Sequence, residues 1–300
     1  MFKHILLPLD GSRLAEEAIP FTVELCKKLG SKVTLLHVIE KDAPPVIHGQ
    51  YHLTNEADAG DYLSMIAKRE FGFCNLVECH VHTEEVSQVS RSIVDHSSEL
   101  APDLIVLCAH GVGGLRDIVA GSIAQQVIAN GKVPVLLIHP EKEQLAKYAG
   151  FKTFLVALDG EEDHDQSLEF AGKLAKQLDS AIRLIRVVPT FLTLSGKQAA
   201  LGTMLPATTS AYLDLMEEEA CEYLQEKLEY WRAKGVKCEA EVQRGEPAQE
   251  VVKSAINSNA SVIVLGTHGK SGLNAFWSGS VAPKIVGKTK TPVLLYPVRR

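Results

Sequence analysis

The residues best suited to chemistry lie near the C-terminus, in a glycine-rich stretch that follows an apolar run. The sequence "VIVLGTHGKSGLNAFWSGS" spaces Gly266, Gly269 and Gly279 by two and then nine residues and ends at Ser280. Glycine lets the backbone turn sharply and lets phosphate oxygens approach with no Cβ in the way. The N-terminus of a following helix and the Ser280 hydroxyl can donate hydrogen bonds to an anion. The stretch is therefore a candidate phosphate-binding loop.

Three familiar glycine motifs do not fit. A P-loop requires glycine where Val264 stands, and a dinucleotide fingerprint that starts at Gly111 requires glycine or alanine in place of Arg116. A nucleophile elbow around Ser271 requires glycine in place of Leu273. An ordinary strand-to-helix turn with a serine cap is the alternative reading of the same residues.

The stretch is the second copy of a longer repeat. "HILLPLDGS" (4–12) resembles "TFLVALDGE" (153–161), so that Asp10 corresponds to Asp159, and "KVTLLHVIE" resembles "AIRLIRVVP" at the same offset of 149. The glycine segments correspond at an offset of 158, so the second copy has gained nine residues. We expect this insertion within 190–210. The repeat is as long as a domain, which predicts one domain over 1–143, a linker near 141–150 and a second domain over 150–300.

Within each copy, short apolar runs alternate with helical patterns. Runs such as "LIVL" and "VIVL" are typical of strands buried on both faces of a parallel sheet. A helix is predicted over 212–234, with Gly235 as its stop signal. The predicted strands are 5–9, 33–39, 76–82, 104–108 and 135–138 in the first copy, and 154–158, 182–188, 238–243, 262–266 and 293–296 in the second.

This alternation predicts an α/β protein made of two tandem, doubly wound domains, each with a five-stranded parallel sheet. Ligands of such sheets bind beyond the carboxyl ends of the strands. Asp10 and Asp159 follow the first strand of each copy, and Val38 and Val187 lie at the end of the second. We also expect the final strands, "PVLLIHP" and "PVLLYPV", to bring the two copies together.

The full pattern G-2x-G-9x-G-[ST], with the strand-end aspartate and valine and the final "TPVLL" strand, resembles the ATP-binding branch of the universal stress protein family. The resemblance covers nearly the whole chain as two tandem domains and implies a Rossmann-like fold of the adenine nucleotide alpha-hydrolase type. It implies that Asp159 and Val187 contact the adenine or ribose of ATP, with Mg²⁺ as a possible companion of the triphosphate. The remaining implied contacts are Gly266, Gly269, Gly279 and Ser280 at the phosphates and Leu265 and Val281 along the cleft.

The first copy departs from this pattern at one position. Cys108 stands where the second copy has its first motif glycine, and its Cβ and thiol would lie where the backbone must approach the ligand. This second candidate site is therefore either weakened or purely structural. Its residues are Asp10, Val38, Gly111, Gly121 and Ser122.

Composition limits the class of protein. A net charge of -6 argues against binding to a nucleic-acid backbone, which requires a basic face. No run of about eighteen apolar residues predicts a membrane span. Six cysteines scattered over 300 residues are typical of reduced thiols in a cytoplasmic protein. His80 and His82 share a face of a predicted strand, but a third metal ligand is not identifiable from the sequence.

The sequence thus predicts a cytoplasmic stress-response or signalling protein that binds ATP, forms a homodimer and acts on a protein partner of unknown identity. A slow ATPase or phosphotransferase on the same fold is one alternative, although no general base or arginine finger is evident near Ser280. A structural stress protein that holds no nucleotide is the other.

Overall fold

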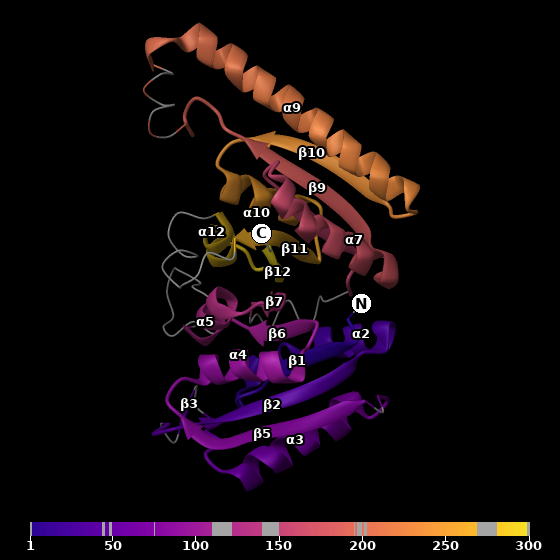
Figure 1. Ribbon diagram of the computed structural model, residues 1–300, viewed down its shortest axis with the longest axis vertical. Coiled ribbons are helices and arrows are strands. Elements are labelled where there is room, and N and C mark those ends of the chain that lie inside the picture. Colours follow the sequence, from indigo (N-terminus) through magenta and orange to yellow (C-terminus); the bar gives the residue numbers. More distant parts are fainter. Residues whose placement is uncertain are drawn as a thin grey trace. The chain divides into compact units, whose positions relative to one another are not determined.

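The computed structural model describes residues 2–43, 46–47, 50–74, 76–109, 122–139, 150–194, 196, 200, 203–268 and 281–298 (Figure 1). Both glycine segments, 110–121 and 269–280, lie outside these residues. Contacts divide the chain into two compact units. The first comprises residues up to Gly150 together with 292–297, and the second comprises 151–268 with 281–291 and Val298.

The first unit is built on a sheet of order β5-β2-β1-β6-β7, in which all neighbouring strands are parallel. The last strand of the chain, β12 (Val293–Val298), runs antiparallel to β7, and Leu294 pairs with its repeat equivalent Leu136. The two final strands therefore lie side by side, as the sequence predicted. The parallel strands are β1 (His4–Pro8), β2 (Lys32–Glu40), β5 (Val77–Val86), β6 (Leu104–Cys108) and β7 (Val135–Ile138).

Helices cover both faces of this sheet. Right-handed crossovers place α2 and α3 on one face and α4 and α5 on the other, because the chain reverses direction across the sheet after β5. A small hairpin, β3 (Val46–Ile47) with β4 (Gln50–Tyr51), follows β2. The helices are α1 (Arg13–Glu16), α2 (Ile19–Leu29), α3 (Glu56–Phe71), α4 (Val89–Leu100) and α5 (Ser122–Asn130).

The second unit repeats this plan with the strand order β10-β9-β8-β11, again parallel. The strands are β8 (Thr153–Leu158), β9 (Ala181–Val188), β10 (Cys238–Arg244) and β11 (Val262–His268). Helices α7 and α9 pack on one face, where the indole of the buried Trp231 lies directly over Gly172. The helical segments are η1 (Glu162–His164), α7 (Asp165–Leu178), α9 (Pro206–Ala233), α10 (Pro247–Asn257) and α12 (Val281–Lys288).

The predicted fold class is confirmed. Every apolar run identified in the sequence is a strand, and the observed ends differ by a few residues; β11, for example, continues two residues beyond Gly266. The predicted helix over 212–234 begins earlier, at Pro206, because proline is well suited to the first turn of a helix. Apolar side chains at helical spacing line its inner face; Met216 is half-buried, and the others are buried: Leu213, Ala220, Leu224, Leu228 and Trp231. Gly235 follows the end of the helix with φ +81°.

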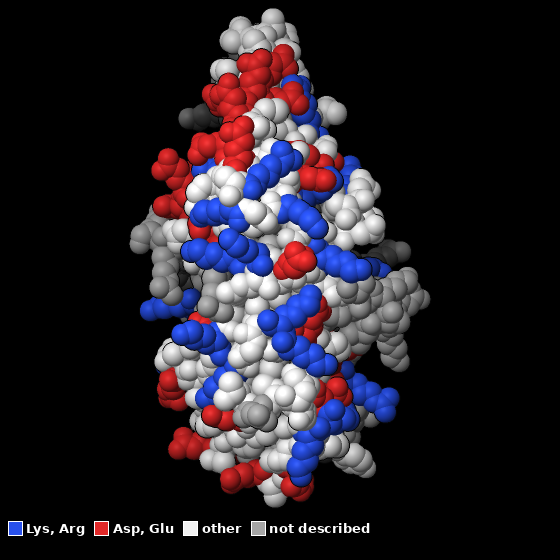
Figure 2. All heavy atoms as spheres, turned by 90° about the vertical axis from the view of Figure 1, so that its right-hand side faces the viewer, with Lys and Arg blue, Asp and Glu red and all other residues white. Residues whose placement is uncertain are grey.

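Acidic side chains lie on the surface, as expected of a chain with a net charge of -6. Figure 2 shows acidic side chains gathered at the top of the view, where α9 lies, and the "EEE" run at 217–219 belongs to this helix. Glu218 and Glu219 are exposed and Glu217 pairs with Arg244, as expected of a solvated helix face. Among the helices that the structure describes, none is both long and apolar enough to cross a membrane.

Candidate functional site

The carboxyl ends of β8 and β11 form the switch point of the second unit. The chain leaves β8 through α7 to reach β9 on one side, whereas β11 pairs with β8 on the other side. The helices that follow β8 and β11 therefore lie on opposite faces of the sheet, and in open α/β sheets the ligand crevice lies beyond the strand ends at such a point. This is where open α/β sheets bind their ligands.

The strand register brings three predicted site residues to this edge. Leu158 of β8 pairs with Arg186 of β9, so the next residues, Asp159 and Val187, lie level with each other. On the other side of β8, Gly266 follows the last registered residue of β11. Residues far apart in the sequence thus come together at the ends of three neighbouring strands.

The other predicted residues of this site are only partly described. Leu265 is buried within β11, and Val281, the first residue of α12, is exposed. Gly269, Gly279 and Ser280 lie outside the described residues, so their place at the site stays a prediction.

Asp159 is held in a fixed orientation. Its Oδ1 accepts the backbone N–H of Glu161 at 3.0 Å, and its Oδ2 lies 2.5 Å from Nδ1 of His164. The His164 ring is buried, whereas the Asp159 side chain remains 51% exposed. Gly160, the next residue, has φ +91°, a left-handed conformation that favours glycine. Asp159 therefore holds an oriented, half-exposed carboxylate at the carboxyl edge of the sheet.

Gly266 packs against the same histidine. A Cβ at this position would lie 3.2 Å from Cγ2 of Val298 and 3.5 Å from two atoms of the His164 ring. The repeat shows a matched exchange, because the first unit has Cys108 in place of Gly266 and Ala15 in place of His164. In the second unit, the absence of a side chain at Gly266 thus leaves space for the His164 ring. In the first unit, the larger Cys108 is combined with the smaller Ala15.

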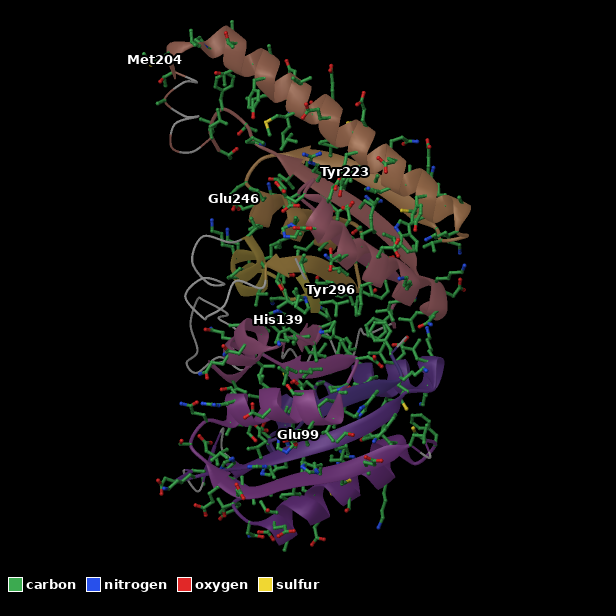
Figure 3. All side chains as sticks on the ribbon, in the orientation of Figure 1. Glu99, His139, Met204, Tyr223, Glu246 and Tyr296 are labelled. Carbon is green, nitrogen blue, oxygen red and sulfur yellow. The ribbon has the colours of Figure 1, made fainter. Side chains whose placement is uncertain are left out.

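Arg186 covers the strand end beside Asp159. A Cβ on Gly160 would lie within 3.1 Å of three guanidinium atoms, so the guanidinium rests on the glycine. Its Cζ also lies 5.3 Å from the centre of the Tyr223 ring, a cation–π contact. Figure 3 labels Tyr223 on α9. Tyr223 is itself fixed, since its hydroxyl donates to Asp165, and Lys227 pairs with the same carboxylate at 2.9 Å. Burial and the Asp165 carboxylate raise the pKa of Tyr223.

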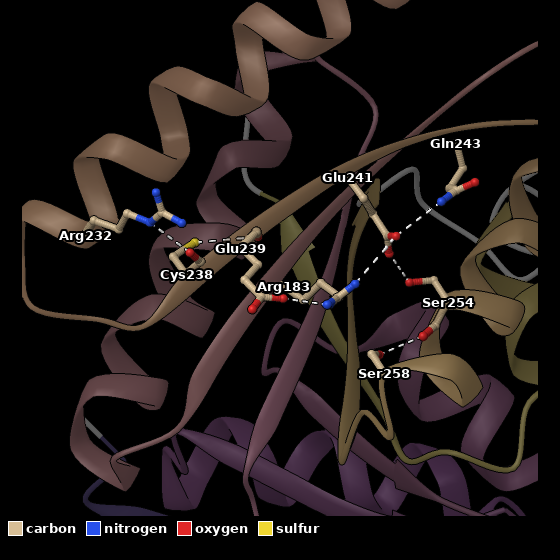
Figure 4. Close-up of polar contacts among 8 residues, drawn as sticks. All are labelled: Arg183, Arg232, Cys238, Glu239, Glu241, Gln243, Ser254 and Ser258. Carbon is tan, nitrogen blue, oxygen red and sulfur yellow. Dashed lines mark hydrogen bonds and ion pairs between the residues drawn. The ribbon is translucent and has the colours of Figure 1, made fainter.

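Arg183, three residues earlier on β9, differs from Arg186 because it forms ion pairs with two glutamates. It lies 2.5 Å from Glu239 and 3.6 Å from Glu241, which in turn accepts the hydroxyl of Ser254 (Figure 4). The guanidinium of Arg186 makes no hydrogen bond or ion pair with any residue in the part of the chain that the structure describes. The guanidinium, which carries five N–H donors, lies at the carboxyl edge of β9.

The first unit repeats the tyrosine anchor. Tyr62 of α3 donates to Glu16 at 3.2 Å, and Arg69 pairs with the same carboxylate at 2.9 Å. Equivalent registers in the two sheets relate Tyr62 to Tyr223, and Glu16 corresponds to Asp165. Burial, followed by the Glu16 carboxylate, raises the pKa of Tyr62. The anchor fastens the helix after the second strand to the helix after the first, so we regard it as structural in both units.

At the carboxyl edge of the first unit, Asp10 adopts a similar turn. Its Oδ1 accepts the N–H of Ser12 at 2.8 Å, and Gly11 has φ +86°. Val38 is buried near the end of β2. The remaining predicted residues of this edge, Gly111, Gly121 and the Ser122 side chain, lie outside the described part of the chain.

Cys108 closes the buried strand β6 and is itself buried. Burial, with the nearby carboxylates of Glu17 and Asp10, raises the pKa of its thiol. The thiol is therefore protonated at neutral pH.

A leucine fills the space over the first-unit glycine. A Cβ on Gly11 would lie 2.8 Å from Cδ1 of Leu53. The leucine is held by His37, whose two ring nitrogens lie 2.8 Å from the carbonyl oxygen of Leu9 and 3.1 Å from that of Leu53. His37 is the repeat equivalent of Arg186. At the same position of the fold, His37 thus contacts the segment that covers Gly11 in the first unit, whereas Arg186 places a positive charge over Gly160 in the second.

The histidine pair of β5 gains a third imidazole from α4. The rings of His80 and His82 each lie with their centres 4.9 Å from that of His96, and Nε2 of His80 lies 3.0 Å from Nε2 of His96. Nδ1 of His96 faces the carbonyl oxygen of Ser92 at 2.8 Å. Burial, and then the charges of His96 and His82, lower the pKa of His80. Within the described ranges, no group of three or more such side chains is arranged to hold a metal ion.

Sequence reasoning did not single out His164, Arg186, Tyr223 or Leu53. The two copies do differ at two of these positions, which could have been noticed. When the copies are aligned, His164 corresponds to Ala15 and Arg186 corresponds to His37. Leu53 lies in a segment without periodicity, which gave no signal.

Comparisons with known proteins agree with the duplicated architecture. The model of the "Universal stress protein family" matches residues 1–139 and again residues 150–297. A universal stress protein of Methanocaldococcus jannaschii is 31% identical over 154 residues, 48% of this chain and 86% of that protein. A universal stress protein of Mycolicibacterium smegmatis is 24% identical over 304 residues, 97% of this chain and 96% of its own. The crystal structure of a universal stress protein from Archaeoglobus fulgidus has a similar fold, with a TM-score of 0.67 at 19% identity, and the match covers 98% of this chain and 96% of that one.

Proposed function

Because the chain belongs to the universal stress protein family, we propose that it is a nucleotide-binding stress-response protein that holds ATP at the carboxyl edge of its second unit. ATP, with Mg²⁺ as the counter-ion of its triphosphate, then acts as a signal. The conformation or assembly of this protein, which we place in the cytoplasm, depends on whether ATP is bound. The alternative of a slow ATPase is a different function of the same site.

The observation that carries this proposal is the strand register at the switch point. Asp159, Val187 and Gly266 lie at neighbouring strand ends, and Asp159 keeps an exposed carboxylate that His164 orients. A carboxylate in this place can accept hydrogen bonds from an amino group of a base or from ribose hydroxyls.

The phosphate end of the ligand is assigned to the glycine motif. Gly266, Gly269, Gly279 and Ser280 would surround the phosphates, with Leu265 and Val281 along the cleft. α12 starts at Val281, directly after Ser280, so the free N–H groups of its first turn support an anion at this position.

The state of His164 favours binding over hydrolysis. His164 is buried and its Nδ1 lies against Asp159, so this histidine orients a carboxylate and does not stand exposed to a water nucleophile. A turnover rate that exceeds that of a nucleotide-free blank and is lost in Gly279→Val would instead support the ATPase.

The first unit is proposed to be the weaker site. Leu53 fills the space over Gly11, and Cys108 replaces the first motif glycine. Asp10 and Val38 keep their equivalent positions, so the unit retains the fold of a nucleotide site with its entrance covered. Pairing of two chains into a homodimer remains part of the proposal and is tested by light scattering on the purified protein.

Calorimetric titration with ATP tests the proposed function, with two variants that differ only in the unit they change. Gly279→Val places a branched side chain in the proposed phosphate loop, and Gly121→Val makes the same change in the first unit. We expect wild type and Gly121→Val to bind ATP alike and Gly279→Val to lose binding. Equal affinity in wild type and Gly279→Val would exclude this site.

A further inference from the structure

Two cysteine thiols meet in the first unit, far from the strand ends described above. Cys26 lies on α2, and Cys74 lies just beyond the end of α3, 48 residues later. Their Sγ atoms are 3.0 Å apart, and both face the carbonyl oxygen of Ser31, at 3.3 and 3.9 Å. A disulfide bond is about 2.05 Å long, so the two sulfurs need to approach by only about 1 Å.

The two thiols differ in access to solvent. Cys26 is buried, whereas Cys74 is half-buried. Burial, and then the neighbouring Cys74 thiol, raise the pKa of Cys26 to about 12. An oxidant from solution therefore meets Cys74 first, and Cys26 is placed behind it as the group that can resolve the product.

The fold does not require this pair. The second-unit equivalents of Cys26 and Cys74 are Ala175 and Gly235, as the repeat and the matching sheet registers show. One unit thus has both thiols and the other has neither, although both units build the same helices around the same strands. A role restricted to the first unit explains why the two cysteines occur together.

We propose that Cys26 and Cys74 form a reversible disulfide in response to hydroperoxides. Cys74 loses its thiol proton and its sulfur attacks the terminal oxygen of the peroxide, so that an S–O bond forms and the O–O bond breaks. The leaving oxygen takes up the proton, which yields a sulfenic acid and water, or an alcohol from an organic hydroperoxide. Cys26 then attacks the sulfenic sulfur as its thiol proton passes to the sulfenic oxygen, so that the S–S bond forms, the S–O bond breaks and a second water leaves. Two cysteines are oxidised by two electrons and one peroxide is reduced by two electrons. A dithiol reverses the reaction by thiol–disulfide exchange.

The bond would act on the first unit as a whole. It closes a loop that contains β2, the β3–β4 hairpin and α3, and therefore includes His37 and Leu53 at the covered strand edge. A cross-link over a loop of this length restricts the unfolded chain strongly. Oxidation should therefore raise the thermal midpoint of the first unit by several degrees.

The test starts from the fully reduced full-length protein, treated with one equivalent of hydrogen peroxide and then with iodoacetamide. We expect the free thiols to fall from six by two, the intact mass before alkylation to fall by about 2 Da, and a non-reducing peptide map to join Cys26 to Cys74. Dithiothreitol should restore both thiols.

Matched variants identify the bond. Cys26→Ala introduces the residue that the second unit has, and Cys74→Ser removes the half-buried thiol; each should abolish the cross-linked peptide and the shift in midpoint. Cys221→Ser, which removes an exposed thiol of α9, should leave both unchanged. The proposal is overturned if peroxide gives only bonds between chains, joins a different pair, or converts Cys74 to a sulfinic acid while Cys26 stays free.

Discussion

The exchange of Gly266 with Cys108 and of His164 with Ala15 gives a quantitative prediction about the candidate site. In Gly266→Cys, the new Cβ would lie 3.2 Å from Val298 and 3.5 Å from the His164 ring, before the sulfur itself is placed. Overpacking of this kind typically costs about 1–3 kcal/mol of the free energy of unfolding. His164→Ala alone removes the contact with Asp159 and should cost about 1–2 kcal/mol, near the low end for a bond to a charged group because the carboxylate is half exposed.

The double variant Gly266→Cys with His164→Ala should cost less than the sum of the two. It reproduces the pair found in the first unit, so the thiol can occupy space that the imidazole has left. We expect a favourable coupling of about 1 kcal/mol or more, as contacting residues commonly show. Urea unfolding followed by Trp231 fluorescence reports on the second unit, because this indole is buried between α7 and α9. Trp277→Phe, as a common background, removes the other tryptophan.

Two results would refute this reasoning. A cost below about 0.5 kcal/mol for Gly266→Cys would mean that the site tolerates the side chain, as exposed positions do. Strictly additive costs would mean that His164 and residue 266 do not share the space. Ala15→His in the first unit provides a converse control, since it should be destabilising beside Cys108 and relieved by Cys108→Gly.

Three further predictions follow from other contacts. Gly172→Ala places a Cβ 2.1 to 2.3 Å from three atoms of the Trp231 ring, so the second unit should lose about 3 kcal/mol and unfold several degrees earlier by calorimetry, and Trp231→Leu should relieve most of the loss. Arg186→Gln should weaken ATP binding about tenfold in calorimetry, while Arg183→Gln, on the same strand but engaged with glutamates, should not. The pKa of His80 is lowered in the folded state, so the unfolded chain binds more protons below about pH 6.5. The contribution of neutral His80 to the stability of the first unit should accordingly be complete above that pH and be lost as the pH falls through the lowered pKa. Urea midpoints measured between pH 7 and 5 should therefore depend less on pH in His80→Gln than in wild type.

The strands and the repeat were predictable because their signals are local. Runs such as "LIVL" at 104–107 form strands buried on both faces, and their apolar side chains leave no other efficient way to be covered. The helix start at Pro206 was missed because the expected insertion over 190–210 shows no clear helical periodicity, although proline is common in the first turn of a helix.

The contacts at the strand ends could not be read from a single copy. His164 orients Asp159 from five residues away, and Tyr223 supports Arg186 from a different helix, so neither contact has a spacing that marks it. The third histidine, His96, reaches His80 by the packing of α4 on the sheet. Only tertiary packing determines such pairs, although a comparison of the two copies indicates where they differ.

Native mass spectrometry in the presence of ATP tests the central claim most directly, because it counts the nucleotides held by each chain. We predict one ATP per chain in wild type, retained in Gly121→Val and lost in Gly279→Val. No bound nucleotide in wild type, or loss of the nucleotide in Gly121→Val alone, would contradict the assignment of the site to the second unit.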